Sequence, residues 1–293
     1  MRVVVAGSSG LVGSALVPEL RAAGHEVIRL VRRTPVAADE RGWDPPAGRI
    51  DDGALDGVDA VVNLCGAGIG ERRWSHARKQ VLIDSRIEPT EVLAGAVAEH
   101  RISVLVNASG VHYYGDAGDR VVDERAPRGR GFLSDLCRDW EAATRRASES
   151  GARVVLARTS HVLAGSGGLL GQLRPLFRVG LGARLGSGDQ YMPWIHIADH
   201  VAAIRFAVEH DAVSGPANLC SPNPVTNREL TRALGRLWHR PTPWMVPKIG
   251  LRVALGDLAD EILMSQRAVP KVLPDNGFEP RYAVLEDALA ALA

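Results

Sequence analysis

Cysteine is scarce in this 293-residue chain, the net charge is close to zero, and long hydrophobic runs are missing. The three cysteines, Cys65, Cys137 and Cys220, are widely spaced and form no CxxC pair, which argues against a disulfide framework and a thiolate metal site. A formal charge of +1 argues against a nucleic-acid-binding surface. No apolar run approaches the roughly 18 residues that a membrane span needs. We therefore expect a soluble, cytoplasmic protein that binds a small molecule, with no metal, nucleic acid or membrane as partner.

The N-terminus places a glycine-rich turn between a short apolar segment and a segment compatible with a helix. Residues 3–6 are apolar on both faces, as in a buried parallel strand. Of the glycines that follow, the first permits a tight turn, the second lets the backbone approach a pyrophosphate, and the third lets the helix pack closely. Backbone N–H groups and the helix dipole would then bind the diphosphate of a dinucleotide. The predicted cofactor-binding residues of this turn are Gly7, Ser8, Ser9, Gly10, Leu11, Val12 and Gly13.

The second predicted strand, residues 25–31, ends in Arg32 and Arg33. Enzymes that prefer NAD usually have an acidic residue here, which accepts a hydrogen bond from the ribose 2′-hydroxyl. Two guanidinium groups instead favour the 2′-phosphate of NADP(H), because arginine presents a charged planar fork. The alternative is that both arginines are only solvent-exposed side chains at the end of a strand and bind no ligand.

Apolar strand-like and amphipathic helix-like segments alternate through the first two thirds of the chain. Further strands are predicted at residues 59–64, 104–108 and 153–157, with helices at 88–99, 132–148 and 199–209 and a loop at 34–57. Thr226 begins an S/T-x-x-E capping box. This order predicts an α/β fold with a Rossmann-type, doubly wound parallel sheet. We expect a nucleotide-binding domain at residues 1–243, with substrate-lobe insertions after about residue 160, and a small mixed α/β C-terminal lobe at 244–293.

Motifs along nearly the whole chain carry a family resemblance. They include GSSGLVG, VVNLCGAGIG, KQVLIDSRIEPT, ASGVHYYGD, RTSHVLAGSGGLL and RLGSGDQYMPWIHIADHVAAI. With them the chain resembles the epimerase family of atypical short-chain dehydrogenase/reductases, of the 39U and YfcH types. The resemblance implies a Rossmann fold, a C-terminal domain of unknown function, and an NADP-dependent oxidoreductase or sugar-nucleotide epimerase. It also implies cofactor contacts from Arg86 and from the turn that contains Leu64 and Cys65. Gly66 continues this turn at the end of a parallel strand, where cofactors bind in open sheets.

The usual catalytic residues of such enzymes are missing. Ordinary relatives use a tyrosine, a lysine four residues later and a serine, and here these positions hold Leu133, Cys137 and approximately Gly110. Other polar residues follow the strands that end beside a bound nicotinamide. The catalytic candidates are Ser109, Tyr113, Tyr114 and Arg158, and His161 is a candidate cofactor contact. A tyrosine there could be the acid, and the arginine could hold an anionic or carbonyl substrate; packing roles are the alternative.

Two functions remain open at this point. The first is an NADP(H)-dependent oxidoreductase that acts on a small carbonyl, an alcohol or a nucleotide-sugar, with the nicotinamide carrying the hydride chemistry. The second is an NADP(H)-binding regulatory or sensor protein without turnover, which the missing tyrosine and lysine favour. A homodimer is a candidate assembly, because Rossmann-type relatives are often dimers. The sequence itself shows no recognisable dimer interface.

Overall fold

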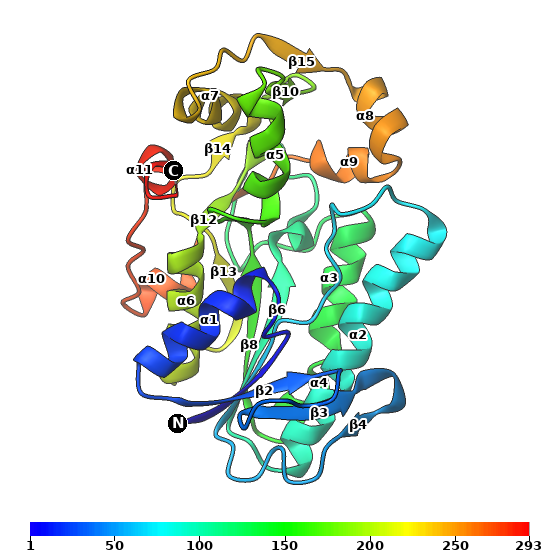
Figure 1. Ribbon diagram of the computed structural model, residues 1–293, viewed down its shortest axis with the longest axis vertical. Coiled ribbons are helices and arrows are strands. Elements are labelled where there is room, and N and C mark those ends of the chain that lie inside the picture. The colour runs from blue at the N-terminus through cyan, green and yellow to red at the C-terminus, as the bar shows by residue number, and fades with distance from the viewer. Residues whose placement is uncertain (293) are drawn as a thin grey trace.

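A computed structural model describes residues 1–292, so Ala293 of the predicted C-terminal lobe lies outside the described residues. Its centre is an eight-stranded sheet in the order β13-β8-β6-β5-β1-β2-β3-β4, parallel except for the β3–β4 pair (Figure 1). The strands are β1 (Arg2–Ala6), β2 (Glu26–Val31), β3 (Glu40–Asp44), β4 (Arg49–Ile50), β5 (Ala60–Asn63), β6 (Val104–Gly110), β8 (Arg153–Thr159) and β13 (Gly215–Leu219). The prediction of a Rossmann-type parallel sheet is confirmed.

Helices cover both faces of this sheet (Figure 1). On one face lie α1 (Leu11–Ala22) and α6 (Ile197–Glu209); on the other lie α2 (His76–Glu99), α3 (Phe132–Ala142) and α4 (Arg145–Glu149). The side chains of β1 alternate between two apolar cores, with Val3 and Val5 in the core of α1 and α6 and Val4 in the core of α2. Because both faces are buried, the central strands are continuous apolar runs.

Three predicted elements differ from the structure. Residues 34–57 were expected to be a loop, and this was wrong: they contain β3, a short 3-10 helix (Pro45–Ala47) and β4. The helix expected at 88–99 begins instead at His76, where the Ser75 hydroxyl accepts a hydrogen bond from Arg78 N. The helix expected at 132–148 is two helices, because the chain leaves helical hydrogen bonding between α3 and α4.

The chain after β8, together with residues 111–122, builds a lobe at the carboxyl ends of the parallel strands. Its small sheets pair β9 (His161–Leu163) with β12 (Trp194–His196), β10 (Ala183–Leu185) with β15 (Trp244–Val246), β11 (Tyr191–Met192) with β14 (Val225–Thr226), and β7 (Val121–Val122) with β16 (Arg267–Ala268). Its helices are η2 (Val111–Tyr114), α5 (Gly168–Arg178), α7 (Asn227–Leu237), α8 (Lys248–Leu255), α9 (Leu258–Ile262), α10 (Val272–Asp275) and α11 (Leu285–Ala290). The predicted capping box at Thr226 is present.

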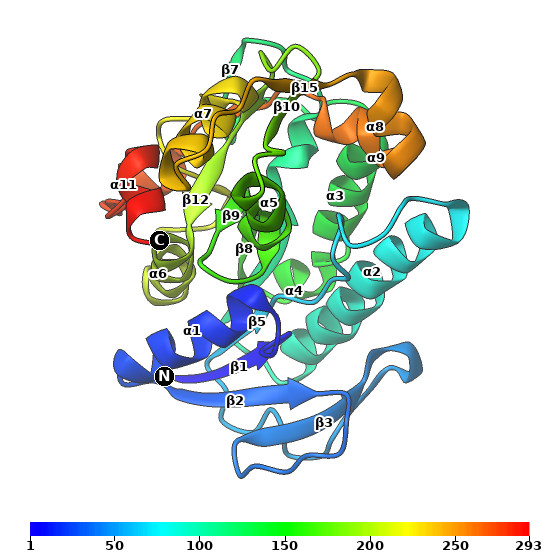
Figure 2. The same cartoon turned by 45° about the horizontal axis from the view of Figure 1, so that its top comes forward.

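Residues 244–292 are spread over several earlier elements (Figure 2). β15 pairs with β10, β16 pairs with β7, α10 contacts β13, and α11 contacts α7. The C-terminal segment therefore ties the small lobe to the edge of the central sheet, above the strand ends where the predicted site residues lie.

Candidate functional site

The glycine-rich turn between β1 and α1 has the close backbone contacts expected of a diphosphate site. Gly7 has a φ of +80°, and a Cβ on it would lie 2.8 Å from the Leu64 carbonyl group. A Cβ on Gly13 would lie 2.3 Å from the Gly7 oxygen, so only glycine lets α1 start against β1. A Cβ on Gly10 would meet only that same oxygen, at 3.4 Å, which leaves the front of the turn open. Gly10 caps α1 without a side-chain acceptor, so the first N–H groups of the helix can bind an anion.

Arg86 of α2 reaches the turn that follows β5. Its guanidinium donates to the carbonyl oxygens of Leu82 (3.1 Å) and Ala67 (3.0 Å) and lies 5.1 Å from the centre of the Trp140 ring. A Cβ on Gly66 would be 3.0 Å from its Cζ, so the glycine makes room for this arginine. The side chain is 6% exposed, and burial lowers the pKa of Arg86 to about 10. Within residues 1–292 its hydrogen-bond acceptors include no carboxylate, so a buried positive charge is left for an anionic or polar ligand.

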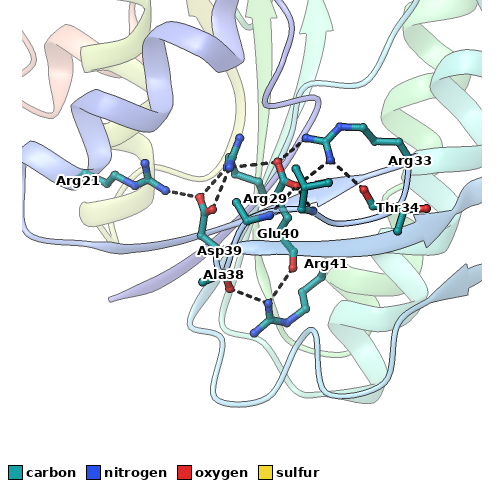
Figure 3. Close-up of polar contacts among 10 residues, drawn as sticks. Arg21, Arg29, Arg33, Thr34, Ala38, Asp39, Glu40 and Arg41 are labelled. Atoms are coloured by element: carbon teal, nitrogen blue, oxygen red, sulfur yellow. Dashed lines mark hydrogen bonds and ion pairs between the residues drawn. The ribbon is translucent and has the colours of Figure 1, made fainter.

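The two arginines after β2 have different environments, and Figure 3 shows the contacts of Arg33. Arg33 donates in bidentate fashion to Glu40, at 2.6 and 2.9 Å, and also to the Thr34 carbonyl oxygen. Arg29 approaches the same carboxylate at 3.1 Å, and the hydrogen bond from Arg33 lowers the pKa of Glu40 to about 2. Arg32, by contrast, is exposed and makes no side-chain hydrogen bond or ion pair within residues 1–292. The expected pair of free guanidiniums is therefore one free arginine and one arginine already bound to a carboxylate.

A groove of about 1080 Å³ opens beside these arginines. Arg32 and Arg33 line one part of it, the β3–β4 hairpin lines a second part, and the C-terminal half of α2 lines a third. The hairpin that the sequence did not predict thus forms a wall of the space next to the end of β2.

Three of the four predicted catalytic residues belong to one buried polar network. Arg158 donates to both carboxylate oxygens of Glu141, at 2.8 and 2.9 Å, and to the Tyr114 hydroxyl at 3.1 Å. The Ser109 hydroxyl donates to Glu141 at 2.7 Å, and the Tyr114 hydroxyl donates to Asn218 at 2.7 Å. Burial raises the pKa of Tyr114 to about 12. Sequence reasoning missed Glu141 and Asn218, because neither belongs to a motif that signals an ion pair.

The fourth candidate, Tyr113, lies beside this network. Its ring is half-buried and faces the Arg158 guanidinium, with the Cζ atom 3.6 Å from the ring centre. Its hydroxyl has no hydrogen-bond partner within residues 1–292, unlike that of Tyr114. Of the four predicted catalytic side chains, Tyr113 is therefore the one whose polar group is not already engaged.

Neutral side chains complete this edge of the sheet. The rings of His112 and His161 lie 6.0 Å apart, and burial lowers their pKa values to about 3 and about 4, so both are uncharged at neutral pH. Burial raises the pKa of Cys137 to about 12, so its thiol stays neutral, and a thiol carries a positive charge in neither of its protonation states. The structure thus brings Ser109, Tyr113, Tyr114, Arg158 and His161 to adjacent strand ends, as the parallel topology requires.

Residues 1–292 contain no group of three or more His, Cys, Asp or Glu side chains that could hold a metal ion. No helix within them combines the length and apolar character needed to cross a bilayer.

Comparisons with known proteins define the class. The model of the NAD dependent epimerase/dehydratase family matches residues 3–220, and that of a domain of unknown function, DUF1731, matches residues 246–292. The chain therefore belongs to the NAD-dependent epimerase/dehydratase family, with a DUF1731 segment at its C-terminal end, and the family resemblance inferred from the motifs is confirmed.

Individual relatives cover the chain almost completely. An epimerase family protein of Mycobacterium tuberculosis is 56% identical over 98% of this chain and 96% of its own length. The crystal structure of human epimerase family protein SDR39U1, which contains NADPH, is 33% identical, with a TM-score of 0.92 over 100% of this chain and 99% of that one. A nucleoside-diphosphate sugar epimerase structure from Corynebacterium glutamicum is 36% identical, with a TM-score of 0.82 over 99% of this chain and 57% of that one.

The ion pair between Glu141 and Arg158 can be tested by its effect on stability. Their side chains are 10% and 3% exposed, so Glu141→Ala leaves Arg158 buried without its counter-charge, and we expect the free energy of unfolding to fall by about 3–5 kcal/mol. The matched control is Glu149→Ala, which removes an exposed pair with Arg145 and should cost about 0.5 kcal/mol or less. Urea denaturation followed by circular dichroism measures both, and equal losses in the two variants would contradict the buried pair.

Proposed function

We propose that this protein is an NADP(H)-dependent oxidoreductase that acts on a small carbonyl or alcohol, with nucleotide-sugars included as substrates. The observation that carries the proposal is the open glycine turn, whose backbone contacts leave no space for side chains at Gly7 and Gly13 but leave the front of Gly10 free. The NADPH in the human relative's structure supports the same cofactor.

The residues present fit such a dinucleotide. The N–H groups at the start of α1 would hold the diphosphate, and Arg32 would bind the 2′-phosphate, since its guanidinium has no partner within residues 1–292. Arg33, bound to Glu40, would keep the loop after β2 in place. Arg86 and the Leu64–Gly66 turn would contact the cofactor between its two ends, with His161 at the start of β9, just after β8 ends. When bound, the nicotinamide supplies or accepts the hydride.

Proton transfer would fall to Tyr113. Its hydroxyl has no hydrogen-bond partner within residues 1–292, and its ring lies against the Arg158 guanidinium, with the Cζ atom 3.6 Å from the ring centre. Ser109, Tyr114 and Arg158 would act as positioning residues, because Glu141 and Asn218 hold them in one arrangement. An oxidoreductase fits better than an epimerase, since an epimerase must both oxidise and reduce the same substrate and depends twice on the proton relay.

A specific observation favours a second function, a sensor that binds NADP(H) without turnover. Leu133 and Cys137 stand where catalytic relatives have tyrosine and lysine, and both are buried at 2% and 5% exposure. The cofactor turn does not depend on these residues, so binding could persist where chemistry is lost.

Arg32→Ala tests the preference for NADP(H). Removal of the one free guanidinium after β2 should weaken NADPH binding by about tenfold or more and leave NADH binding nearly unchanged, because NADH lacks the 2′-phosphate. The control is Arg49→Ala, which removes a positive charge from the same groove at a side chain paired with Asp44. Calorimetric titration with both cofactors measures the effect. An equal loss for NADPH and NADH, or the same loss in the control, would count against the assignment.

Turnover separates the two candidate functions. Purified protein is mixed with NADPH and a panel of aldehydes, ketones and nucleoside-diphosphate sugars, and the loss of absorbance at the nicotinamide band is followed. We expect turnover that falls about 100-fold or more in Tyr113→Phe and that disappears in Gly10→Ala, whose new methyl group occupies the diphosphate position without a clash in the fold. NADPH binding without turnover across the panel would instead favour the sensor, and absence of binding would contradict both.

A further inference from the structure

Large apolar side chains that remain exposed gather at one end of the small lobe. Of the twelve such side chains within residues 1–292, seven come from two short segments, residues 176–181 and 244–253, and are between 48% and 74% exposed. Trp244 Nε1 donates to the Gly180 carbonyl oxygen at 3.1 Å, so the two segments are neighbours in space. In Figure 1, β15 and α8 lie at the end of the molecule opposite to β3 and β4. We call these side chains the apolar tip; they are Leu176, Val179, Leu181, Trp244, Met245, Ile249 and Val253.

The apolar tip is large for the surface of a monomer. Large side chains have roughly 150–250 Å² of surface each, so seven of them at these exposures present on the order of 800 Å². The largest apolar patch on a typical monomer is about 300–600 Å², and larger ones mark sites that bind a protein or a membrane. The size of the tip therefore indicates a surface that docks on a partner.

The arrangement of the tip suits a fluid partner better than a rigid one. Trp244 and Met245 are successive residues of β15 and leave the strand in opposite directions, yet both are about half exposed. A rigid protein would need a groove around both sides of this strand, whereas the headgroup region of a bilayer accommodates side chains from several directions. Ile249 and Val253 are one turn apart on α8, and each follows a basic residue. Apolar side chains next to basic ones on a helix are typical of segments that lie in a membrane interface.

The two chain segments that build this end of the lobe are strongly basic. Residues 168–188 and 230–256 contain eight Arg and Lys residues and no Asp or Glu. The other residues of the chain contain 27 Arg and Lys and 34 Asp and Glu, so the overall charge of +1 conceals one positive end. Of the eight, only Arg236, Lys248 and Arg252 form ion pairs within residues 1–292. The charge beside the apolar tip is therefore complementary to an anionic partner.

A basic hollow of about 560 Å³ lies at the end of α7. Its lining includes Arg232, Arg236, His239 and Arg240. Arg240 Nε donates to the Arg178 carbonyl oxygen at 3.0 Å, so the hollow adjoins the end of α5 and the apolar tip. Guanidinium groups bind phosphate oxygens through a planar fork. The hollow thus fits the phosphate of a lipid headgroup next to apolar side chains.

We propose that the apolar tip and the basic hollow dock this protein on the surface of a bilayer that contains anionic phospholipids. The apolar side chains enter the boundary between headgroups and acyl chains, where tryptophan is enriched. The arginines contact the lipid phosphates, because anionic leaflets attract basic residues. The expectation of no membrane partner rested on the missing long apolar runs, which a protein bound at the surface of a bilayer does not need. This inference does not rest on the proposed function.

Vesicle flotation of the full-length protein tests the proposal. Vesicles of phosphatidylcholine with about one third phosphatidylglycerol should bring the protein into the lipid fraction at about 0.1 M salt. Binding should be about tenfold weaker or less with pure phosphatidylcholine vesicles, and also at about 1 M salt, because salt screens the attraction. NADPH affinity should be the same with and without vesicles, since the groove beside β3 and β4 lies at the other end of the molecule.

Two double variants separate the apolar and the basic contributions. Ile249→Glu combined with Val253→Glu should weaken binding to the anionic vesicles by about tenfold or more, because carboxylates would meet anionic headgroups. Arg178→Gln combined with Arg232→Gln should also weaken it by about tenfold or more, because two positive charges are lost. All four side chains are exposed, so both variants should fold, which circular dichroism checks.

The matched control is Val36→Glu combined with Val81→Glu. It makes the same kind of change at side chains that are 81% and 46% exposed outside the apolar tip, and it should leave vesicle binding nearly unchanged. A wild-type protein that does not bind the anionic vesicles would overturn the proposal, whether or not it self-associates or binds an acidic protein or a nucleic acid. Equal binding to neutral and anionic vesicles, or a loss as large in the control as in the α8 variant, would overturn it as well. So would unchanged binding of the α8 variant, since the protein would then adsorb by charge alone.

The NADPH titrations on the same samples report on the cofactor site independently of the lipid. A protein that binds NADPH but no vesicles would overturn this inference and leave the proposed function in place.

Discussion

The contact between Gly13 and Gly7 is the constraint on which the rest of the site depends. A side chain at Gly13 would lie 2.3 Å from the Gly7 oxygen, so this glycine pair fixes the start of α1 against the end of β1. The N-terminus of α1 then points across the carboxyl edge of the sheet. β5 pairs in parallel with β1, β6 with β5, and β8 with β6. The carboxyl ends of these strands therefore meet at this same edge. Tyr113 and Arg158 lie together for that reason, although they are far apart in sequence, and Arg86 reaches the turn after β5 from α2.

The helix that carries the proton relay in ordinary relatives has a packing role here. Leu133 and Leu136 of α3 belong to an apolar cluster with Trp74 and Leu258. The helix is held at its start by Glu261, which accepts a hydrogen bond from Leu133 N, and further along by the pair between Glu141 and Arg158. These contacts fix α3 to β8 and to the C-terminal segment. α3 thus contributes packing contacts and the Glu141 carboxylate to this edge of the sheet.

Local patterns predicted the parts of the fold that local forces decide. The apolar strands, the glycine turn and the Thr226 capping box were all readable, because each depends on a few adjacent residues. The β3–β4 hairpin was not, since four of the seven residues in its two strands are charged and only Trp43 of these strands is a buried member of an apolar core. The pairing of Arg33 with Glu40 and the burial of Glu141 beside Arg158 depend on how β3 and α3 pack in three dimensions. The sequence predicted the arginines as site residues but could not say which carboxylates hold them.

One helix connects the cofactor turn with the small lobe. α5 begins at Gly168, where a Cβ would lie 2.8 Å from the Leu11 side chain of the glycine turn, and near its end Phe177 belongs to the apolar core of the lobe. Its eleven residues span about 16 Å, with Pro175 inside the helix. The small sheets around it have two strands each, and such sheets are marginal alone, so the lobe depends on packing for its order. A ligand bound at the glycine turn would therefore lie beside the start of a helix on which the packing of the lobe depends.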